Sequence, residues 1–514
     1  MSKNIVIGIG GTGAKVVEAI LHATAIGLGP SNLTVGLVDQ DQSNGNVSRT
    51  REALQLINRA RKQWRTSGSP HFIGDGDLLK ARVDALGSGL WVPHPETKAS
   101  LVQLLGHLGK DGAALDLLFA QGPLEQQMRL DEGYRGRAHI GSAAITSAAA
   151  DSPKFWRDLE EEIANAKGGD EVRILLVGSV FGGTGAAGFP TISRLVRRII
   201  DLAGLDRNIH VGGILMLPYF RFSAPEDVDA NVARTEDLLP QTRGALRYYH
   251  SLLERERIFD ELFLVGWNPP FDLGYHQPGT GEQRNPALLP EVLAALGAAR
   301  FLTSSHAPTG EILVSARESA NRVGWSDLPS PNAKFPDLPY EMVARHLRFA
   351  AAWKLWQPIL RREKWKDEYS SHNWFKKQRL TEVDFSNEPG SANLASLDDY
   401  LDASVNWLAT MKAYADRQDL GWSLWNTDPL VDGEANFDSP TNPVRLRTQL
   451  SDGDLHSGYA KLVDSLGGAE PLSDASHLHY RMNTDAVSGQ FEGLGQFIGS
   501  LHDFCSVREQ KGAL

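Results

Sequence analysis

Two glycine-rich loops hold the residues of this sequence best suited to chemistry. The first is GIGGTGAKV at residues 8–16, in which Gly8, Gly10 and Gly13 have the spacing G-x-G-x-x-G. It follows the apolar run NIVIGIG and opens KVVEAILHATAIG, whose apolar residues recur three and four positions apart, as in a helix. Glycine lets the backbone approach a phosphate closely, and the helix N-terminus offers free N–H groups. The loop therefore predicts a phosphate-binding site.

Taken alone, the first loop is typical of a dinucleotide site. Asp39 ends the next apolar run, LTVGLVD, where a dinucleotide fold places an acid for the ribose. Lys15 follows Ala14, so the loop lacks the Gly-Lys-Ser/Thr order of a Walker loop. An NAD(P)-dependent oxidoreductase is one open interpretation.

The second loop, GSVFGGTGAAG at residues 178–188, repeats the GGTG core of the first. It also lies between an apolar run, RILLV, and a helical pattern, FPTISRLVRRII. A dinucleotide fold needs only one such loop for its pyrophosphate. A second loop on a later strand favours a different nucleotide-binding fold.

The paired loops resemble those of the tubulin/FtsZ superfamily. FGGTGAAG is similar to its signature GGGTG[ST]G, which wraps the phosphates of GTP, and GIGGTGAKVVEAI is similar to its first loop, GVGGAGxNAV. VDQDQSN at 38–44 resembles its second loop, of the form NTDAQ. The three loops occur in family order, and the sequence is most similar to the divergent bacterial FtsZ-like group.

Weaker matches extend the resemblance over about the first 300 residues. GYRGRAHIGSAAI at 133–145 occupies the place of the third loop, which senses the terminal phosphate, and GWN at 266–268 that of a pair giving an asparagine to the guanine base. LPYFRF at 217–222 resembles the strand end before the ribose loop. The apolar helix predicted over 285–304 corresponds to the central helix that joins the family's two domains.

The resemblance implies GTP or GDP as ligand, together with Mg²⁺. Backbone N–H groups of both loops would hold the phosphates, while Asp39 and Asp41 would approach Mg²⁺ without ligating it directly. Lys15 is either a point charge for a phosphate or a solvated lysine on the first helical turn. The implied nucleotide-binding residues are Gly10, Gly11, Thr12, Gly13, Lys15, Asp39, Asp41, Gly141, Gly182, Gly183, Thr184, Gly185, Arg243 and Asn268. Arg137 and His139 in the third-loop segment are either phosphate sensors or surface residues.

The sequence departs from the family at two points that bear on chemistry. Phe181 and Ala187 replace the first and last glycines of the signature. No NxDxxD loop, which polarises the attacking water in the neighbouring subunit of a filament, follows the central helix. Asp327 is a weak catalytic candidate, at the wrong spacing and in the context of an ordinary turn. The sequence thus leaves open a head-to-tail filament with GTPase activity and a non-polymerising GTP-binding switch whose helical C-terminal domain binds a partner.

Alternating strand and helix patterns predict a doubly wound α/β fold with a mainly parallel sheet. We expect a tubulin/FtsZ-like GTP-binding domain over residues 1–305, including the central helix. A strand and proline-rich linker over 306–340 and a mostly helical domain over 341–514 follow. Residues 50–130 are expected to be helical.

Composition limits the remaining function classes. The formal net charge of −11 argues against a large nucleic-acid footprint, and a single cysteine, Cys505, allows no intramolecular disulfide, which fits a cytoplasmic protein. No apolar run reaches 18 residues, so no transmembrane segment is expected. His276 and His306 are isolated, and no His/Cys metal site stands out in the sequence.

Overall fold

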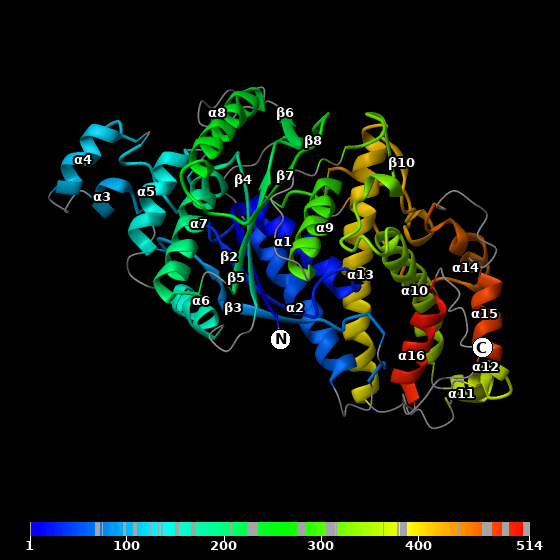
Figure 1. Ribbon diagram of the computed structural model, residues 1–514. Helices are drawn as coiled ribbons and strands as arrows, with labels where there is room; N and C mark the ends of the chain where they lie inside the picture. Colours follow the sequence, from blue (N-terminus) through cyan, green and yellow to red (C-terminus); the bar gives the residue numbers. More distant parts are fainter. Residues whose placement is uncertain are drawn as a thin grey trace.

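Six parallel strands form the central sheet, in the order β3-β2-β1-β4-β5-β7 (Figure 1). Their bounds are β1 Lys3–Ile9, β2 Asn32–Val38, β3 Arg82–Trp91, β4 Val172–Ser179, β5 Ile209–Met216 and β7 Glu261–Val265. Every residue of β4 is buried, as expected for an apolar run in the middle of a parallel sheet.

The computed structural model describes most of the chain. The described residues are 2–66, 72–74, 76–95, 99–105, 110–123, 125–131, 133–134, 137–149, 154–165, 171–205, 208–223, 235–275, 284–304, 314, 316–362, 364–377, 380, 388–438, 443–464, 475–485 and 493–506. His276 and His306 fall outside them.

Helices cover both faces of the sheet (Figure 1). On β5, a Cβ added to Gly212 would lie 2.9 Å from Phe301 of α9 (Leu289–Thr303), and one added to Gly213 would lie 3.0 Å from Phe189 of α7 (Gly183–Ala203). These neighbouring glycines point to opposite faces of the strand. Helix α1 (Gly10–Ala25) packs with α9 and with α2 (Gly45–Arg65), whereas α5 (Ala138–Ala149) and α6 (Lys154–Ala164) pack with α7. The sheet is therefore covered on both sides, as predicted.

The order of the strands reverses between β1 and β4. From β1 the chain proceeds through β2 to β3 on one side, and then crosses to β4, β5 and β7 on the other. In open α/β sheets, ligands bind in the crevice at the carboxyl ends of the strands at such a switch point. Both glycine loops leave the sheet there.

The prediction of helix throughout residues 50–130 is wrong at β3. Its residues pair in parallel with β2, with a register shift between Val35 and Leu37. Gly87 and Gly89 have φ of 61° and 80°, so the strand is irregular here and loses the period-two pattern of a regular strand. Because these two glycines break the alternation of apolar and polar residues, the sequence does not predict a strand here.

The C-terminal region is largely helical, as predicted. Its helices are α10 Leu338–Leu360, α11 Trp365–Tyr369, α12 Asn373–Lys377, α13 Glu388–Arg417, α14 Asp452–Gly458, α15 Ala475–Thr484 and α16 Gly493–Phe504. Helix α13 packs against both α2 and α10, so it joins this region to the sheet-containing part (Figure 1). The tryptophans Trp353, Trp356 and Trp425 are buried in the core.

The remaining elements are short or peripheral. They are α3 Leu101–Leu105, α4 Lys110–Leu118, α8 Thr235–Leu253, the paired strands β6 Phe220–Ser223 and β8 Phe271–Tyr275, and the paired strands β9 Arg322–Gly324 and β10 Gly421–Ser423. Strand β9 lies within the predicted linker. Among the described helices, none is long and apolar enough to cross a membrane.

Candidate functional site

The N-termini of α1 and α7 meet at the switch point of the sheet. Strands β1 and β4 are neighbours, with Gly8 opposite Val177, and each runs directly into its glycine loop. A Cβ on Gly10, whose φ is +73°, would lie only 2.8 Å from the backbone nitrogen of Gly185. The close approach of the two loops therefore requires glycine. Loops about 170 residues apart along the chain form one surface.

Both helix N-termini at this surface lack a side-chain cap. Neither N-cap residue, Ile9 for α1 or Gly182 for α7, accepts a hydrogen bond with a side chain. Gly11, Thr12 and Gly183 are half-buried and Gly182 is exposed, so the loops reach solvent. Unsatisfied N–H groups and the positive ends of two helix dipoles converge here, and this arrangement favours an anion such as phosphate.

Asp39 connects the segment VDQDQSN (residues 38–44) to the second glycine loop (residues 178–188). Its side chain is buried at the end of β2, where Oδ1 accepts a hydrogen bond from Thr184 Oγ1 at 3.0 Å and Oδ2 accepts one from Asn44 Nδ2 at 2.9 Å. Burial, followed by the nearby charge of Asp41, raises the pKa of Asp39 to about 7, against the opposing hydrogen bond from Thr184. The charge of this carboxyl thus changes near neutral pH.

Asp41 is better placed than Asp39 to serve a magnesium ion. It is half-buried, and its Oδ1 accepts hydrogen bonds from the backbone and hydroxyl of Ser43 at 2.9 and 2.7 Å. Both oxygens of Asp39 already accept hydrogen bonds from protein groups. Mg²⁺ keeps several waters and takes few protein ligands beside phosphates, so a carboxylate such as Asp41 suits contact with the ion through water.

The third-loop segment packs against the second glycine loop. A Cβ on Gly183 would lie 2.8 Å from Cβ of Tyr134, and the Tyr134 hydroxyl donates to Gln40 Oε1 at 3.3 Å. In α5, a Cβ on Gly141 would lie 2.5 Å from Cβ of Ala187. Gly141 thus contacts the start of α7, although residues 135–136 of this segment lie outside the described part.

The two charged residues of the third-loop segment have partners away from the glycine loops. Arg137 Nη1 lies 3.6 Å from Met128 Sδ, and His139 Nε2 lies 3.1 Å from Glu125 Oε1. The surface-loop alternative therefore fits these two residues better than contact with a phosphate.

Lys15 is buried and does not extend into solvent. Its Nζ lies 2.5 Å from Glu291 Oε1, with side-chain exposures of 1% and 0%. The Tyr219 hydroxyl donates to the same oxygen at 2.8 Å. Burial lowers the pKa of Lys15, and the charge of Glu291 opposes that shift. The prediction of a solvated lysine is wrong, and the ammonium is paired with a carboxylate of α9.

The two departures from the family signature are packing residues. The ring of Phe181 is buried, with its centroid 6.2 Å from that of Tyr219 and 5.5 Å from that of Phe220. Ala187 is fully buried against Gly141. Ser179 Oγ donates to the carbonyl of Phe181 and thereby fixes the turn before α7. A glycine at 181 would leave this aromatic cluster unfilled.

Polar residues that the sequence analysis did not select connect the loops to the segment before α9. Asn46 Oδ1 accepts from the backbone nitrogen of Asn285 at 2.8 Å, and Arg49 Nη1 donates to its carbonyl at 2.6 Å. Arg49 Nη2 also pairs with Glu18 of α1 at 2.7 Å. Asn44 N-caps α2, and a Cβ on Gly11 would lie 2.8 Å from its Nδ2. The N-cap pattern after VDQDQS was the available sequence signal for Asn44.

Three predicted residues make other contacts or lie exposed. Arg243 is exposed on α8, and Asn268 is exposed after β7, at the sheet edge, with its carbonyl accepting from Arg317 Nη2. Asp327 closes a short turn, since its Oδ1 accepts from Glu318 N at 3.0 Å and its Oδ2 from Gly324 N at 2.8 Å. These contacts support the turn interpretation of Asp327.

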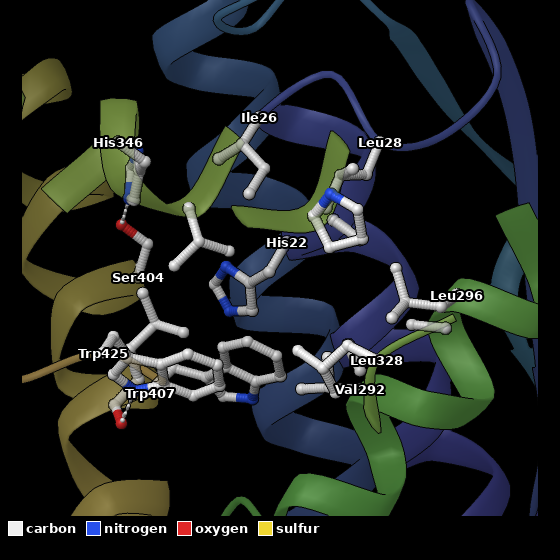
Figure 2. A pocket seen from close by; sticks show the side chains of 16 residues that line it. His22, Ile26, Leu28, Val292, Leu296, Leu328, His346, Ser404, Trp407 and Trp425 are labelled. Carbon is white, nitrogen blue, oxygen red and sulfur yellow. Dashed lines mark hydrogen bonds between the residues drawn. The ribbon is translucent and has the colours of Figure 1, made fainter. Parts of the chain in front are cut away.

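A separate cavity of about 40 Å³ lies behind the site, between α1 and α9 on one side and α10 and α13 on the other (Figure 2). Figure 2 shows the ring of His22 beside the indole of Trp407, and the ring centroids are 4.8 Å apart. Burial, with a smaller effect of Arg49, lowers the pKa of His22 to about 3. The cavity is too small for a nucleotide, and it marks the contact between the two parts of the chain.

Comparison with known proteins assigns no family. No family model matches the sequence, and no curated protein matches it. Matches among solved structures include an Escherichia coli str. K-12 protein described as "Putative oxidoreductase". It shares 10% identity, the match covers 52% of this chain and 95% of that chain, and the TM-score is 0.22. A likeness at that level carries no argument about function.

Proposed function

We propose that this chain is a tubulin/FtsZ-like protein that binds GTP or GDP with Mg²⁺. The observation that carries the proposal is the convergence of the uncapped N-termini of α1 and α7, with Gly10 packed against Gly185. One phosphate chain placed there would receive N–H donors from both loops. Mg²⁺ supplies charge neutralisation of the phosphates when it is bound.

In the proposed complex, backbone groups and side chains of the two loops have different roles in holding the phosphates. Backbone N–H groups of Gly10–Gly13 and Gly182–Gly185 donate to phosphate oxygens. Thr184 holds Asp39 by its hydroxyl, and Asp41 stands beside them at the loop surface. Asp41 would hold the metal through water, because a bare carboxylate beside a phosphate is repelled.

Asp39 argues for this proposal over a dinucleotide site. The strand order fits both folds, so it does not separate them. A dinucleotide site requires the acid after the second strand to accept from a ribose hydroxyl. Asp39 is 2% exposed, and its oxygens accept from Thr184 and Asn44, so it is turned toward the second glycine loop. An NAD(P)-dependent oxidoreductase is therefore the weaker alternative.

Within the GTP-binding proposal, a switch is favoured over a hydrolysing filament. Both carboxylate oxygens of the catalytic candidate Asp327 accept hydrogen bonds from backbone N–H groups of its own turn. Arg49 and Asn46 of α2 connect that helix to the segment before α9, and α9 borders the helical C-terminal region. Nucleotide bound at the loops could thus bias the surface of the helical region toward a partner. Self-association head to tail remains the second form of the proposal.

The identity of the bound nucleotide tests the proposal. The purified chain is denatured, and the released small molecules are separated by ion-exchange chromatography. We expect GDP or GTP in amounts approaching the protein concentration. Release of NAD(P) in place of guanine nucleotide would contradict the proposal. Sedimentation with GTP and Mg²⁺ then separates the two forms, since the switch stays in the supernatant and the filament pellets.

A further inference from the structure

Two histidines and an aspartate come together in the helical C-terminal region. Asp452 and His456 lie one turn apart on α14, on the same face of that helix, and His479 lies on the adjacent α15 (Figure 1). One ligand atom from each side chain lies within 4.8 Å of the other two. None of these residues belongs to the proposed nucleotide site.

The spacing of these atoms suits a tetrahedral metal ion. His479 Nε2 lies 3.2 Å from Asp452 Oδ1, and His456 Nδ1 lies 3.5 Å from Asp452 Oδ2. Ligands about 2.0–2.1 Å from a tetrahedral Zn²⁺ are roughly 3.3–3.4 Å apart. The two contacts use different oxygens of the Asp452 carboxylate, so each imidazole nitrogen already lies at about this distance from one carboxylate oxygen. The three ligand atoms lie within 4.8 Å of one another, and the cluster has to contract from that span to hold the ion.

His479 Nε2 is a buried polar atom that lies 3.2 Å from Oδ1 of Asp452. Within the described part of the chain, no group other than this carboxylate is in position to pair with it. In the tautomer that carries its proton on Nδ1, Nε2 and the carboxylate oxygen are both acceptors, so a cation between them would satisfy both. The ring of His456 stacks on that of His479, with centroids 5.2 Å apart and planes 9° apart, so both imidazoles are presented to the same space.

The cluster is also accessible to an ion from solution. The side-chain exposures of Asp452, His456 and His479 are 66%, 42% and 26%. Water can therefore fill the fourth position. His456 Nδ1 also lies 2.9 Å from the backbone oxygen of Asp452, a contact that coordination would replace.

We propose that Asp452, His456 and His479 bind a divalent transition metal ion of the Zn²⁺ class. Imidazole and carboxylate are ligands that Zn²⁺ accepts, and a fourth water completes the tetrahedron. The ion links α14 to α15 and so holds two helices that are separated along the sequence by residues 459–474. This site is independent of the nucleotide proposal, since it uses none of the same residues.

Calorimetric titration of the full chain with ZnCl₂, free of nucleotide, tests this site. We expect one saturable site that is weakened in His456→Ala and His479→Ala. The loss should be at least the 10–100-fold typical of removing a group that only orients a ligand. The matched control is His477→Ala, on the same helix but outside the cluster, which should bind Zn²⁺ like the wild type. Equal affinity in all four proteins, or no saturable binding, would overturn the proposal.

A second readout keeps the test independent of folding defects. Co²⁺ in place of Zn²⁺ gives visible absorption bands whose intensity reports tetrahedral coordination. The ring of Trp356 lies 6.4 Å from that of His479, so bound Co²⁺ should also quench tryptophan fluorescence. The conservative variant Asp452→Asn should fold and lose these signals. Bands and quenching that persist in Asp452→Asn and His479→Ala would place the ion elsewhere and overturn the assignment.

Discussion

Lys15 Nζ lies 2.5 Å from Glu291 Oε1 in the interior of the protein. Lys15 is in the second turn of the helix that opens from the first glycine loop, and Glu291 is in the first turn of α9. The pair therefore fixes the helix behind the proposed phosphate site against the helix that borders the C-terminal region. A change in the position of α1 would have to move α9 or separate two buried charges.

Removal of one partner of this ion pair should be strongly destabilising. In Lys15→Met, Glu291 is left buried without its cation, and such a loss costs about 3–5 kcal/mol. The double variant Lys15→Met/Glu291→Gln should recover much of this loss, because the amide is neutral and its oxygen can still accept from Tyr219. Urea denaturation of the three proteins measures the effect. A single variant within about 0.5 kcal/mol of wild type, the range typical of surface positions, would show that the pair is not formed.

The same double variant tests the role of Lys15 toward phosphate. If the Lys15 ammonium only pairs with Glu291 of α9, the nucleotide affinity of Lys15→Met/Glu291→Gln should stay close to that of the wild type. Calorimetric titration with GTP and Mg²⁺ gives the comparison. A large fall in affinity in a protein that remains folded would instead assign Lys15 to the phosphates.

Replacing Phe181 by the glycine of the family signature should destabilise the folded protein. Phe181→Gly removes a buried ring from the cluster with Tyr219 and Phe220. Truncation of a buried phenylalanine costs about 3–5 kcal/mol. Thermal unfolding followed by circular dichroism should show a marked fall in Tm. A variant as stable as the wild type with tighter GTP binding would mean that Phe181 obstructs the site.

Asp39 should make the stability of the fold depend on pH. Its pKa is about 7 in the folded protein and ordinarily 3.8, so between these pH values the native state holds a proton that the unfolded state has lost. Stability from this group is therefore present below about pH 4 and declines as the pH rises toward 7. Relative to wild type, Asp39→Asn should become progressively more stable over that window. Urea denaturation at pH 4.5, 6 and 7.5 measures the difference, and a constant difference would rule out the shift.

His22 should make the folded protein less stable as the pH falls, which is the opposite of the pH dependence expected from Asp39. Burial lowers its pKa from 6.5 to about 3, so the unfolded state takes up a proton as the pH falls below 6.5 while the folded state does not. Stability is thus lost on acidification between about pH 6.5 and 3. His22→Leu should lessen this loss relative to wild type in acid unfolding curves. Parallel curves for the two proteins would show that His22 is protonated in the folded state.

The sequence predicted the elements that carry local signals. Apolar runs ending in glycine identified β1 and β4, the apolar run that ends at Asp39 identified β2, and the helical periods after the glycines identified α1 and α7. The adjacency of the loops at the switch point follows from placing those strands in one parallel sheet. Strand β3 was missed because Gly87 and Gly89 interrupt its alternation.

Tertiary partners could not be predicted in the same way. A lysine on the first turns of a helix has the same local sequence whether it faces water or a carboxylate, and Glu291 lies far along the chain from Lys15. Phe181 occupies a glycine position of the signature, and only its packing on Tyr219 explains it. Likewise His456 and His479 are isolated in sequence and meet only because α14 packs on α15.

The central claim is that two glycine loops form one guanine-nucleotide site. Its most direct test is calorimetric titration of GTP with Mg²⁺, and of NAD⁺, into wild type, Gly183→Val and Gly244→Ala. A side chain at 183 collides with Tyr134, whereas Gly244 on α8 has open space around it. Gly183→Ala replaces Gly183→Val if circular dichroism shows that the latter is unfolded. We expect GTP to bind the wild type and Gly244→Ala but not the variant at 183, and NAD⁺ to bind none of these proteins. Binding of NAD⁺ without GTP, or equal GTP binding by all the proteins, would contradict it.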